Sequence, residues 1–180
     1  MTDSLDPGWR PAVPLVGRIV SGRGLDGSIL LVMRAAVIFL GVAAALSGLG
    51  SLILGAGSQH PRIGGTSARI LISLAMGIAA IGISTVGKAG PDLDSPGHLA
   101  VSVFRITMRR VLFAAGVGPA GLAISWVSGD ASYVIFGTGL AILLMAVAAP
   151  TSRRLAQFQS EVVDAGSEIS VLEALQRSYR

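Results

Sequence analysis

The side chains that could perform chemistry are few, and the most polar cluster lies in the segment "PDLDSPGH", residues 91–98. The carboxylates of Asp92 and Asp94 could bind a hard cation through oxygen. However, the prolines and the glycine of this segment favour a turn, and Asp is itself a preferred turn residue. We therefore interpret the segment as a turn and predict no metal site. A catalytic constellation, if the chain had one, would have to assemble around Asp92, Asp94 and His98.

The two histidines, His60 and His98, could be considered as haem ligands, because bundles of four helices can hold a haem between facing histidines. They fall in two loops that the topology predicted below places on opposite sides of a hydrocarbon core about 30 Å thick. They cannot bind one iron within a single chain, and we predict no cofactor.

The apolar segments of the chain contain no charged residue over residues 35–54, 70–86, 111–127 and 131–149. Charged groups within a membrane generally mark ion or substrate pathways, so their absence argues against a proton-coupled transporter. The serines and threonines of these segments have no neighbouring His or Lys that could act as a base. The chain also has no Cys. We predict that the protein is not an enzyme.

The composition predicts a membrane protein. Of 180 residues, 52% are hydrophobic and only 13% are charged, and the mean hydropathy is +0.71. A soluble domain has about 25% charged residues. The apolar residues form blocks close to the ~20 residues that a membrane-spanning helix needs. The sequence therefore predicts an all-α bundle of four transmembrane helices within residues 29–150, with spans at about 29–54, 70–86, 111–127 and 131–149.

Two polar segments flank this bundle. Residues 1–28 contain prolines at positions 7, 11 and 14 and several glycines, which make a stable helix unfavourable and indicate a flexible N-terminal arm. Residues 151–180 are predicted to form a cytoplasmic helical tail. Within the bundle, "MRAAVIFLGV" (residues 33–42) resembles "MRRVLFAAGV" (residues 108–117), so the chain either contains two duplicated hairpins or shows a chance match in a composition rich in Ala, Gly, Val and Leu.

The positive charges predict the orientation, because Lys and Arg in short flanking loops stay on the cytoplasmic side. If the N-terminus is cytoplasmic, only Arg62 and Arg69 of the 14 Lys and Arg residues lie outside. Both termini are therefore expected to be cytoplasmic. Arginines beside the spans are predicted to contact anionic lipid headgroups, where each is worth about 1 kcal/mol. These residues are Arg34, Arg105, Arg109, Arg110, Arg153 and Arg154.

Small residues are placed on every predicted span at spacings that bring helices close together. Helices already in lipid associate through such residues and through interhelical hydrogen bonds. The contact is either within one bundle or with a partner, and the sequence leaves both open. Pro119 is expected to kink the third span. The predicted packing or partner residues are Gly41, Ala45, Gly48, Ser73, Gly77, Ala114, Gly118, Gly121, Gly137 and Ala141.

The tail is predicted to contain two helices. Thr151 or Ser152 can cap a helix that ends at Gly166, and "SVLE" at residues 170–173 fits a capping box for a second helix. The residues expected to make the apolar tail contact are Leu155, Phe158, Val162, Leu172 and Leu175. Lipid-binding helices are rich in Lys and Arg, whereas the charged residues within 155–176 are all acids, which favours a protein contact over a lipid surface.

Together these features predict a non-catalytic accessory, anchoring or assembly subunit of a larger complex in a bacterial plasma membrane. The compact loops and the Ala, Gly and Val content suggest the bacterial source. The expected partners are other membrane-protein subunits or further copies of the chain, together with membrane lipids, and not nucleic acid. The alternative is a homo-oligomeric pore or carrier for a small uncharged or lipidic solute.

Overall fold

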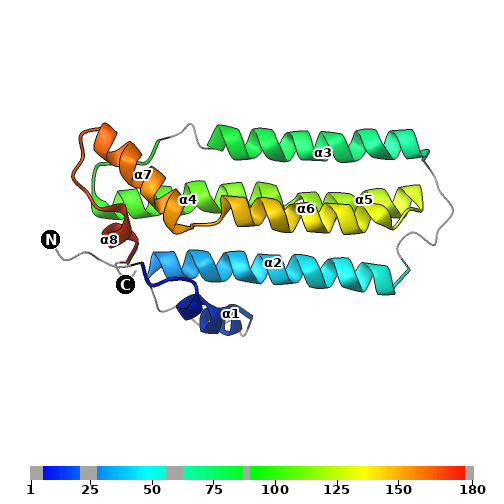
Figure 1. Ribbon diagram of the computed structural model, residues 1–180, viewed down its shortest axis with the longest axis horizontal. Helices are drawn as coiled ribbons and strands as arrows, with labels where there is room; N and C mark the ends of the chain where they lie inside the picture. Colours follow the sequence, from blue (N-terminus) through cyan, green and yellow to red (C-terminus); the bar gives the residue numbers. More distant parts are fainter. Residues whose placement is uncertain (1–5, 21–27, 56–62, 87–89, 177–180) are drawn as a thin grey trace. The chain divides into compact units, whose positions relative to one another are not determined.

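The computed structural model describes residues 6–20, 28–55, 63–86 and 90–176, and its regular elements are all helices (Figure 1). A short 3-10 turn, Arg10–Ala12, leads into the first α-helix. The α-helices are α1 (Val13–Val20), α2 (Ile29–Ile53), α3 (Gly65–Val86), α4 (Pro96–Ala115), α5 (Val117–Ser128), α6 (Ser132–Ala148), α7 (Ser152–Asp164) and α8 (Val171–Gln176). The all-α class predicted from the sequence is confirmed.

Three helical stretches are long and apolar enough to cross a membrane. They are α2, α3 and the stretch Pro96–Ser128 that contains α4 and α5, with mean hydropathies of 2.5, 1.9 and 1.6 over their most apolar windows. Helices α6 and α7, which meet at an angle of 46°, make a fourth candidate if they are counted as one bent span. By helix length and hydropathy the chain is therefore a multi-pass membrane protein.

The third apolar helix begins earlier than the predicted span at residues 111–127. It starts at Pro96, so Arg105, Arg109 and Arg110 are all helical residues of α4. The helix is interrupted at Gly116, three residues before Pro119. Because proline has no amide hydrogen, Pro119 cannot donate to the carbonyl of Ala115 in the preceding turn. The interruption lies one turn before Pro119, and the kink expected there stays a prediction.

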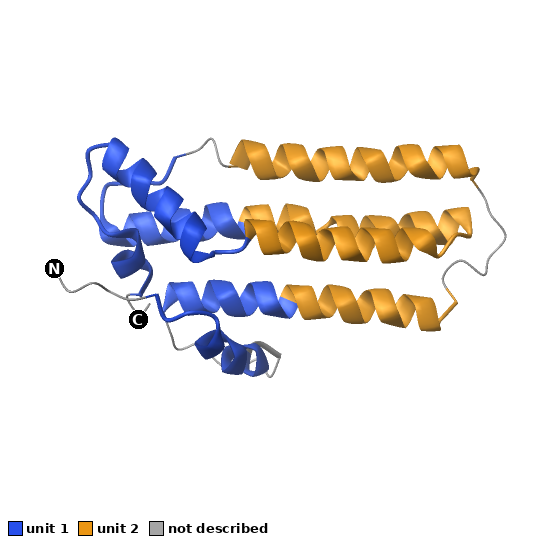
Figure 2. Cartoon of the chain, in the orientation of Figure 1, with its two compact units in different colours: residues 1–39, 87–108, 149–180 blue, residues 40–86, 109–148 orange. Residues whose placement is uncertain are grey.

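The chain divides into two compact units, which Figure 2 shows in different colours. Unit 1 contains residues 1–39, 87–108 and 149–180, and unit 2 contains residues 40–86 and 109–148. Unit 2 thus consists mainly of apolar helix, whereas unit 1 collects the two terminal segments and the beginnings of α2 and α4.

The closest packing in unit 2 is between α5 and α6. Gly121 and Gly137 face each other so closely that a Cβ on Gly121 would lie 2.8 Å from the Cα of Gly137 and 2.5 Å from the carbonyl oxygen of Tyr133. Helix α3 packs against α5, where Ala68 and Ile72 are buried with Ile124. The absence of side chains at the two glycines allows this direct contact between helix backbones.

Unit 1 contains a helix that the sequence did not predict. In α1, Leu15 is buried together with Ala12 against Ala35 of α2. The expectation that residues 1–28 contain no stable helix is therefore wrong for residues 13–20. Pro11 and Pro14 lie in the first turns of their helices, where the missing amide hydrogen costs little. Packing on α2 then stabilises a segment whose local propensity for helix is poor.

The tail forms α7 and α8, as predicted. The Thr151 side chain caps α7 by accepting a hydrogen bond from the amide of Arg154, and Gly166 follows the helix with a φ of +80°. Ser170 accepts from the amide of Glu173 at the start of α8. The side chain of Gln159 joins the two helices, because it donates to the carbonyl of Ile169 and accepts from the amide of Val171.

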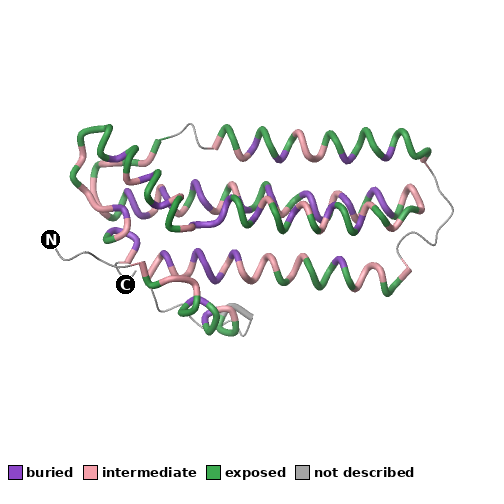
Figure 3. Tube along the Cα trace, viewed as in Figure 1, coloured by how far each residue is buried: buried purple, intermediate pink, exposed green. Residues whose placement is uncertain are grey.

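The apolar face of this tail is covered by the chain itself (Figure 3). Leu155, Phe158, Val162 and Leu175 are buried, and Leu172 is half-buried. All of them belong to unit 1, which also contains most of α4 and the beginning of α2. In contrast, the acidic residues Glu161, Asp164 and Glu168 of the tail are exposed.

Candidate functional sites

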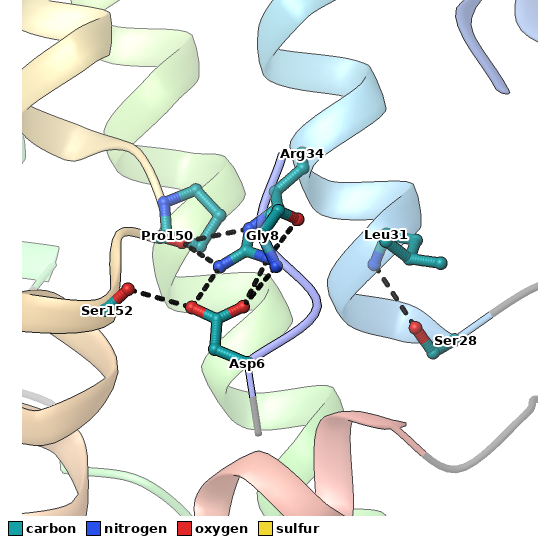
Figure 4. Close-up of polar contacts among 7 residues, drawn as sticks. All are labelled: Asp6, Gly8, Ser28, Leu31, Arg34, Pro150 and Ser152. Atoms are coloured by element: carbon teal, nitrogen blue, oxygen red, sulfur yellow. Dashed lines mark hydrogen bonds and ion pairs between the residues drawn. The ribbon is translucent and has the colours of Figure 1, made fainter. Parts of the chain in front are cut away.

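The largest buried polar group in the described part of the chain is the guanidinium of Arg34, whose side chain has no exposed surface (Figure 4). Arg34 lies in the second turn of α2. Its Nη1 donates to Asp6 Oδ1 at 2.6 Å and to the carbonyl of Gly8 at 2.5 Å. Its Nη2 donates to Asp6 Oδ2 at 2.8 Å, and both Nη2 and Nε donate to the carbonyl of Pro150 at 3.3 and 3.4 Å.

These contacts satisfy the arginine completely. A guanidinium has five N–H donors in a planar fork, and that fork matches the two oxygens of a carboxylate. The indole of Trp9 adds a cation–π contact, with Cζ of Arg34 at 5.3 Å from the ring centre. We call this cluster of Asp6, Gly8, Trp9, Arg34, Pro150 and Ser152 the Arg34 clamp.

The clamp also lowers the pKa of its carboxylate, Asp6. The hydrogen bonds from Arg34 hold the pKa of Asp6 far below its usual value of 3.8, against the opposing effect of partial burial. Ser152 contributes to the same shift, because its hydroxyl donates to Asp6 Oδ2 at 2.8 Å. Asp6 is therefore ionised at any physiological pH. With every donor of Arg34 used internally, the geometry suits a structural connection between the N-terminal segment, α2 and the turn before α7.

The headgroup contact predicted for Arg34 does not agree with this position. An arginine at the start of an apolar helix is expected to extend toward the membrane surface. Instead, Asp6 provides an acid 28 residues earlier in the chain, and the Arg34 side chain is buried against this partly exposed carboxylate. Sequence reasoning missed Asp6 as a functional residue. The available indication was that Asp6 is one of three acids in residues 1–28, the segment that precedes the apolar helix of Arg34.

The other predicted headgroup arginines have more accessible surface. Arg105, Arg109 and Arg153 are exposed, whereas Arg110 and Arg154 are half-buried. Arg154 Nη1 donates to Gln157 on the same helix at 3.1 Å. Contact with lipid headgroups stays a prediction for these five residues.

The predicted packing residues fall into two groups. Those of α5 and α6 face one another, as shown by Gly121 with Gly137 and by Gly118, where a Cβ would lie 3.6 Å from the Cβ of Ala141. Gly48 of α2 approaches the side chain of Thr138, and Ala114 is buried. The second group is open: Ala45 and Ser73 are exposed, and a Cβ on Gly41 or Gly77 would meet no atom within 4 Å.

The polar segment before α4 brings Asp92, Asp94 and His98 together. Their potential ligand atoms lie within 4.8 Å of one another, and all three residues are exposed. Asp92 Oδ1 accepts from the amide of Asp94 at 3.1 Å, which is the turn geometry predicted for these residues, and Asp92 Oδ2 lies 3.7 Å from His98 Nδ1. Two carboxylates and one imidazole are the groups that could ligate a cation here. His60 lies outside the described residues.

Unit 2 also contains two hollows. A groove of about 280 Å³ has walls of small residues such as Ala44, Gly48 and Gly118, with Ser47, Ser51 and Thr138 as its polar groups. The Ser51 hydroxyl donates to the carbonyl of Ser47 at 2.7 Å. A second, shallow cleft of about 520 Å³ is lined by Val86, Arg109, Leu112 and Phe113.

Comparison of the chain with known proteins gives no assignment. No protein-family model, no curated protein and no solved structure matches it. The function must therefore be inferred from the geometry of these sites and from the apolar helices.

Proposed function

We propose that the chain is a non-catalytic accessory, anchoring or assembly subunit of a larger complex in a bacterial plasma membrane. The observation that carries this proposal is the open face of α3. Only 17% of the most apolar window of α3 is buried within the chain; Ser73 is exposed, and a Cβ on Gly77 would meet no atom within 4 Å. Small residues allow close approach of helices in lipid, so this face suits a helix of another subunit.

The Arg34 clamp supports the non-catalytic part of the proposal. A substrate or proton needs a polar group with an unused donor or acceptor in the reactive position. The clamp uses the five N–H groups of Arg34 on Asp6, Gly8 and Pro150, so its charge serves the fold. The exposed acids of α7, Glu161 and Asp164, provide a charged surface that suits a basic partner.

We further propose four spans, with α6 as the fourth and with both termini in the cytoplasm. The 17 residues of α6 extend about 26 Å, close to the ~30 Å of a hydrocarbon core. A reporter that is active only in the cytoplasm, fused after Arg180, is expected to be active, because an even number of spans returns the chain to its starting side. A reporter fused at Gly129, between α5 and α6, is expected to be inactive. The opposite pattern would reject this topology.

The partner proposal predicts that Gly77→Leu removes a co-purifying polypeptide without unfolding the chain. The position has open space around it, so the added side chain should block a partner and leave the packing of the chain intact. Affinity purification in mild detergent, followed by mass spectrometry, measures the partner. We expect a loss of more than about tenfold, equivalent to 1.4 kcal/mol of association free energy.

Gly139→Leu is the matched control, because a Cβ at Gly139 of α6, as at Gly77, meets no atom within 4 Å. This variant should retain the partner. If the wild-type chain purifies alone as a monodisperse species, or if both variants behave alike, α3 is not the partner surface.

The groove of about 280 Å³ favours one alternative, a homo-oligomeric pore or carrier for a small uncharged or lipidic solute. It lies within the apolar helices, and its lining contains no charged side chain. The same purification separates the two functions. An accessory subunit carries other polypeptides with it, whereas a pore or carrier of this kind appears as an oligomer of the single chain and confers flux on liposomes.

A further inference from the structure

The cleft beside Arg109 differs from the groove because it combines one cation with apolar walls. Val86, the last residue of α3, lies on one side, and Arg109, Leu112 and Phe113 of α4 lie on the other. Its volume of about 520 Å³ falls within the range of ~300–1,000 Å³ that is usual for ligand sites.

The guanidinium of Arg109 has no counter-ion in the part of the chain that the structure describes. Arg109 is exposed, and none of the hydrogen bonds or ion pairs among the described residues involves it. Arg34 shows the contrasting case, since its charge is completely satisfied by Asp6 and two carbonyls. The planar donors of Arg109 are therefore available to an external anion, and a phosphate matches their geometry.

One apolar wall of the cleft, Phe113, packs against α3. The ring of Phe113 lies against Gly82, where an added Cβ would come within 2.5 Å of the ring carbons. Despite this contact, Phe113 remains 40% exposed and Leu112 remains 58% exposed. The walls thus present a fixed apolar surface next to the cation.

The lengths of the two helices that line the cleft place it at the level of a membrane interface. The helical stretch from Arg109 to Ser128 extends about 29 Å, which equals the ~30 Å thickness of the hydrocarbon core. On the neighbouring helix, the candidate span α3 ends at Val86. Both helices therefore place the cleft where the hydrocarbon meets the lipid headgroups.

We propose that this cleft binds an anionic phospholipid, with the lipid phosphate on Arg109 and an acyl chain along Leu112 and Phe113. Basic pockets between transmembrane helices are suited to anionic headgroups. Charge complementarity selects this occupant over a neutral lipid, and the apolar walls select it over a soluble anion. The site is independent of the partner surface on α3, which is built from Ser73 and Gly77.

The test uses the full chain in nanodiscs that contain phosphatidylglycerol and phosphatidylcholine in equal amounts. Native mass spectrometry after release of the protein measures the ratio of the two bound lipids. Arg109→Ala is expected to lower the preference for phosphatidylglycerol about fivefold, which corresponds to the loss of one surface charge. Arg109→Lys should keep most of the preference, and Leu112→Ser should reduce the total lipid bound.

Arg69→Ala is the control, because Arg69 is an exposed arginine of α3 that lines no described cleft. An equal loss of preference in Arg69→Ala and Arg109→Ala would show general charge attraction and overturn the proposal, as would an unchanged ratio in Arg109→Ala. Displacement of the lipid by millimolar inorganic phosphate would assign the site to a soluble anion. Dissociation of an oligomer in Arg109→Ala would assign the arginine to a protein contact.

Discussion

Asp6→Asn is expected to lower the free energy of unfolding by about 3 kcal/mol, because it leaves the buried guanidinium of Arg34 without its counter-ion. The substitution keeps the size of the side chain but replaces one carboxylate oxygen by an NH2 group, which cannot accept from Arg34. The remaining carbonyl acceptors, Gly8 and Pro150, cannot neutralise the charge. Reversible unfolding in mixed micelles, with increasing SDS and helical content as the signal, measures the change.

A double-substitution cycle separates loss of the ion pair from loss of packing. Arg34→Met removes the charge while retaining a long apolar side chain, so Asp6→Asn combined with Arg34→Met should be more stable than Asp6→Asn alone by about 1–2 kcal/mol. Asp164→Asn, at an exposed position on α7, should change stability by less than about 0.5 kcal/mol. If Asp6→Asn is no more destabilising than Asp164→Asn, the clamp does not contribute to the fold.

The pH dependence of this difference follows from the lowered pKa of Asp6. In the unfolded chain Asp6 should titrate near its usual value of 3.8, whereas in the folded chain Arg34 keeps it ionised to much lower pH. A carboxylate of this kind stabilises the fold above the unfolded pKa and loses that contribution as the pH falls toward the folded pKa. The stability difference between wild type and Asp6→Asn should thus be constant from about pH 5 to pH 8 and shrink below about pH 4.

Gly121→Ala is expected to destabilise the chain by about 3 kcal/mol, because overpacking against backbone cannot be relieved by a side-chain rotation. The new methyl group would lie 2.8 Å from the Cα of Gly137 and 2.5 Å from the carbonyl oxygen of Tyr133. Helices α5 and α6 would have to separate. The same SDS titration measures the loss.

Gly139→Ala is the control on α6, because a Cβ at Gly139 meets no atom within 4 Å. It should be neutral or stabilising by up to about 1 kcal/mol, since alanine has the better helix propensity. Equal effects of the two substitutions would mean that the contact between Gly121 and Gly137 is not close in the membrane.

The apolar helices could be predicted because each of them is specified by consecutive residues of the sequence. A run of about 20 apolar residues must be helical in lipid whatever surrounds it, and α2 ends one residue before the predicted boundary at position 54. The caps of the tail helices are local too, as Thr151 and Ser170 show. Each of these features depends on residues a few positions apart in the sequence.

The clamp and the helix contacts were not predictable in this way, because they depend on residues that meet only in the folded chain. Asp6 and Arg34 are 28 residues apart, and α1 depends on the buried Ala35 for its packing. The similar segments around Arg34 and Arg109 suggest similar surroundings for the two arginines. Arg34 is nevertheless buried and paired, whereas Arg109 is exposed. Small residues likewise occur on every span, but only distances show that Gly121 meets Gly137.

The acceptor that Pro150 provides for Arg34 has a consequence for biosynthesis. The two residues are separated by 116 positions, so a ribosome that adds about 5–20 residues per second delivers the carbonyl roughly 6–23 s after the arginine. During that interval the guanidinium has only its upstream acceptors, the Asp6 carboxylate and the Gly8 carbonyl. A nascent chain that stops before residue 150 therefore retains a cation in α2 whose N–H donors are not all hydrogen-bonded, and synthesis of the turn after α6 supplies the missing acceptor.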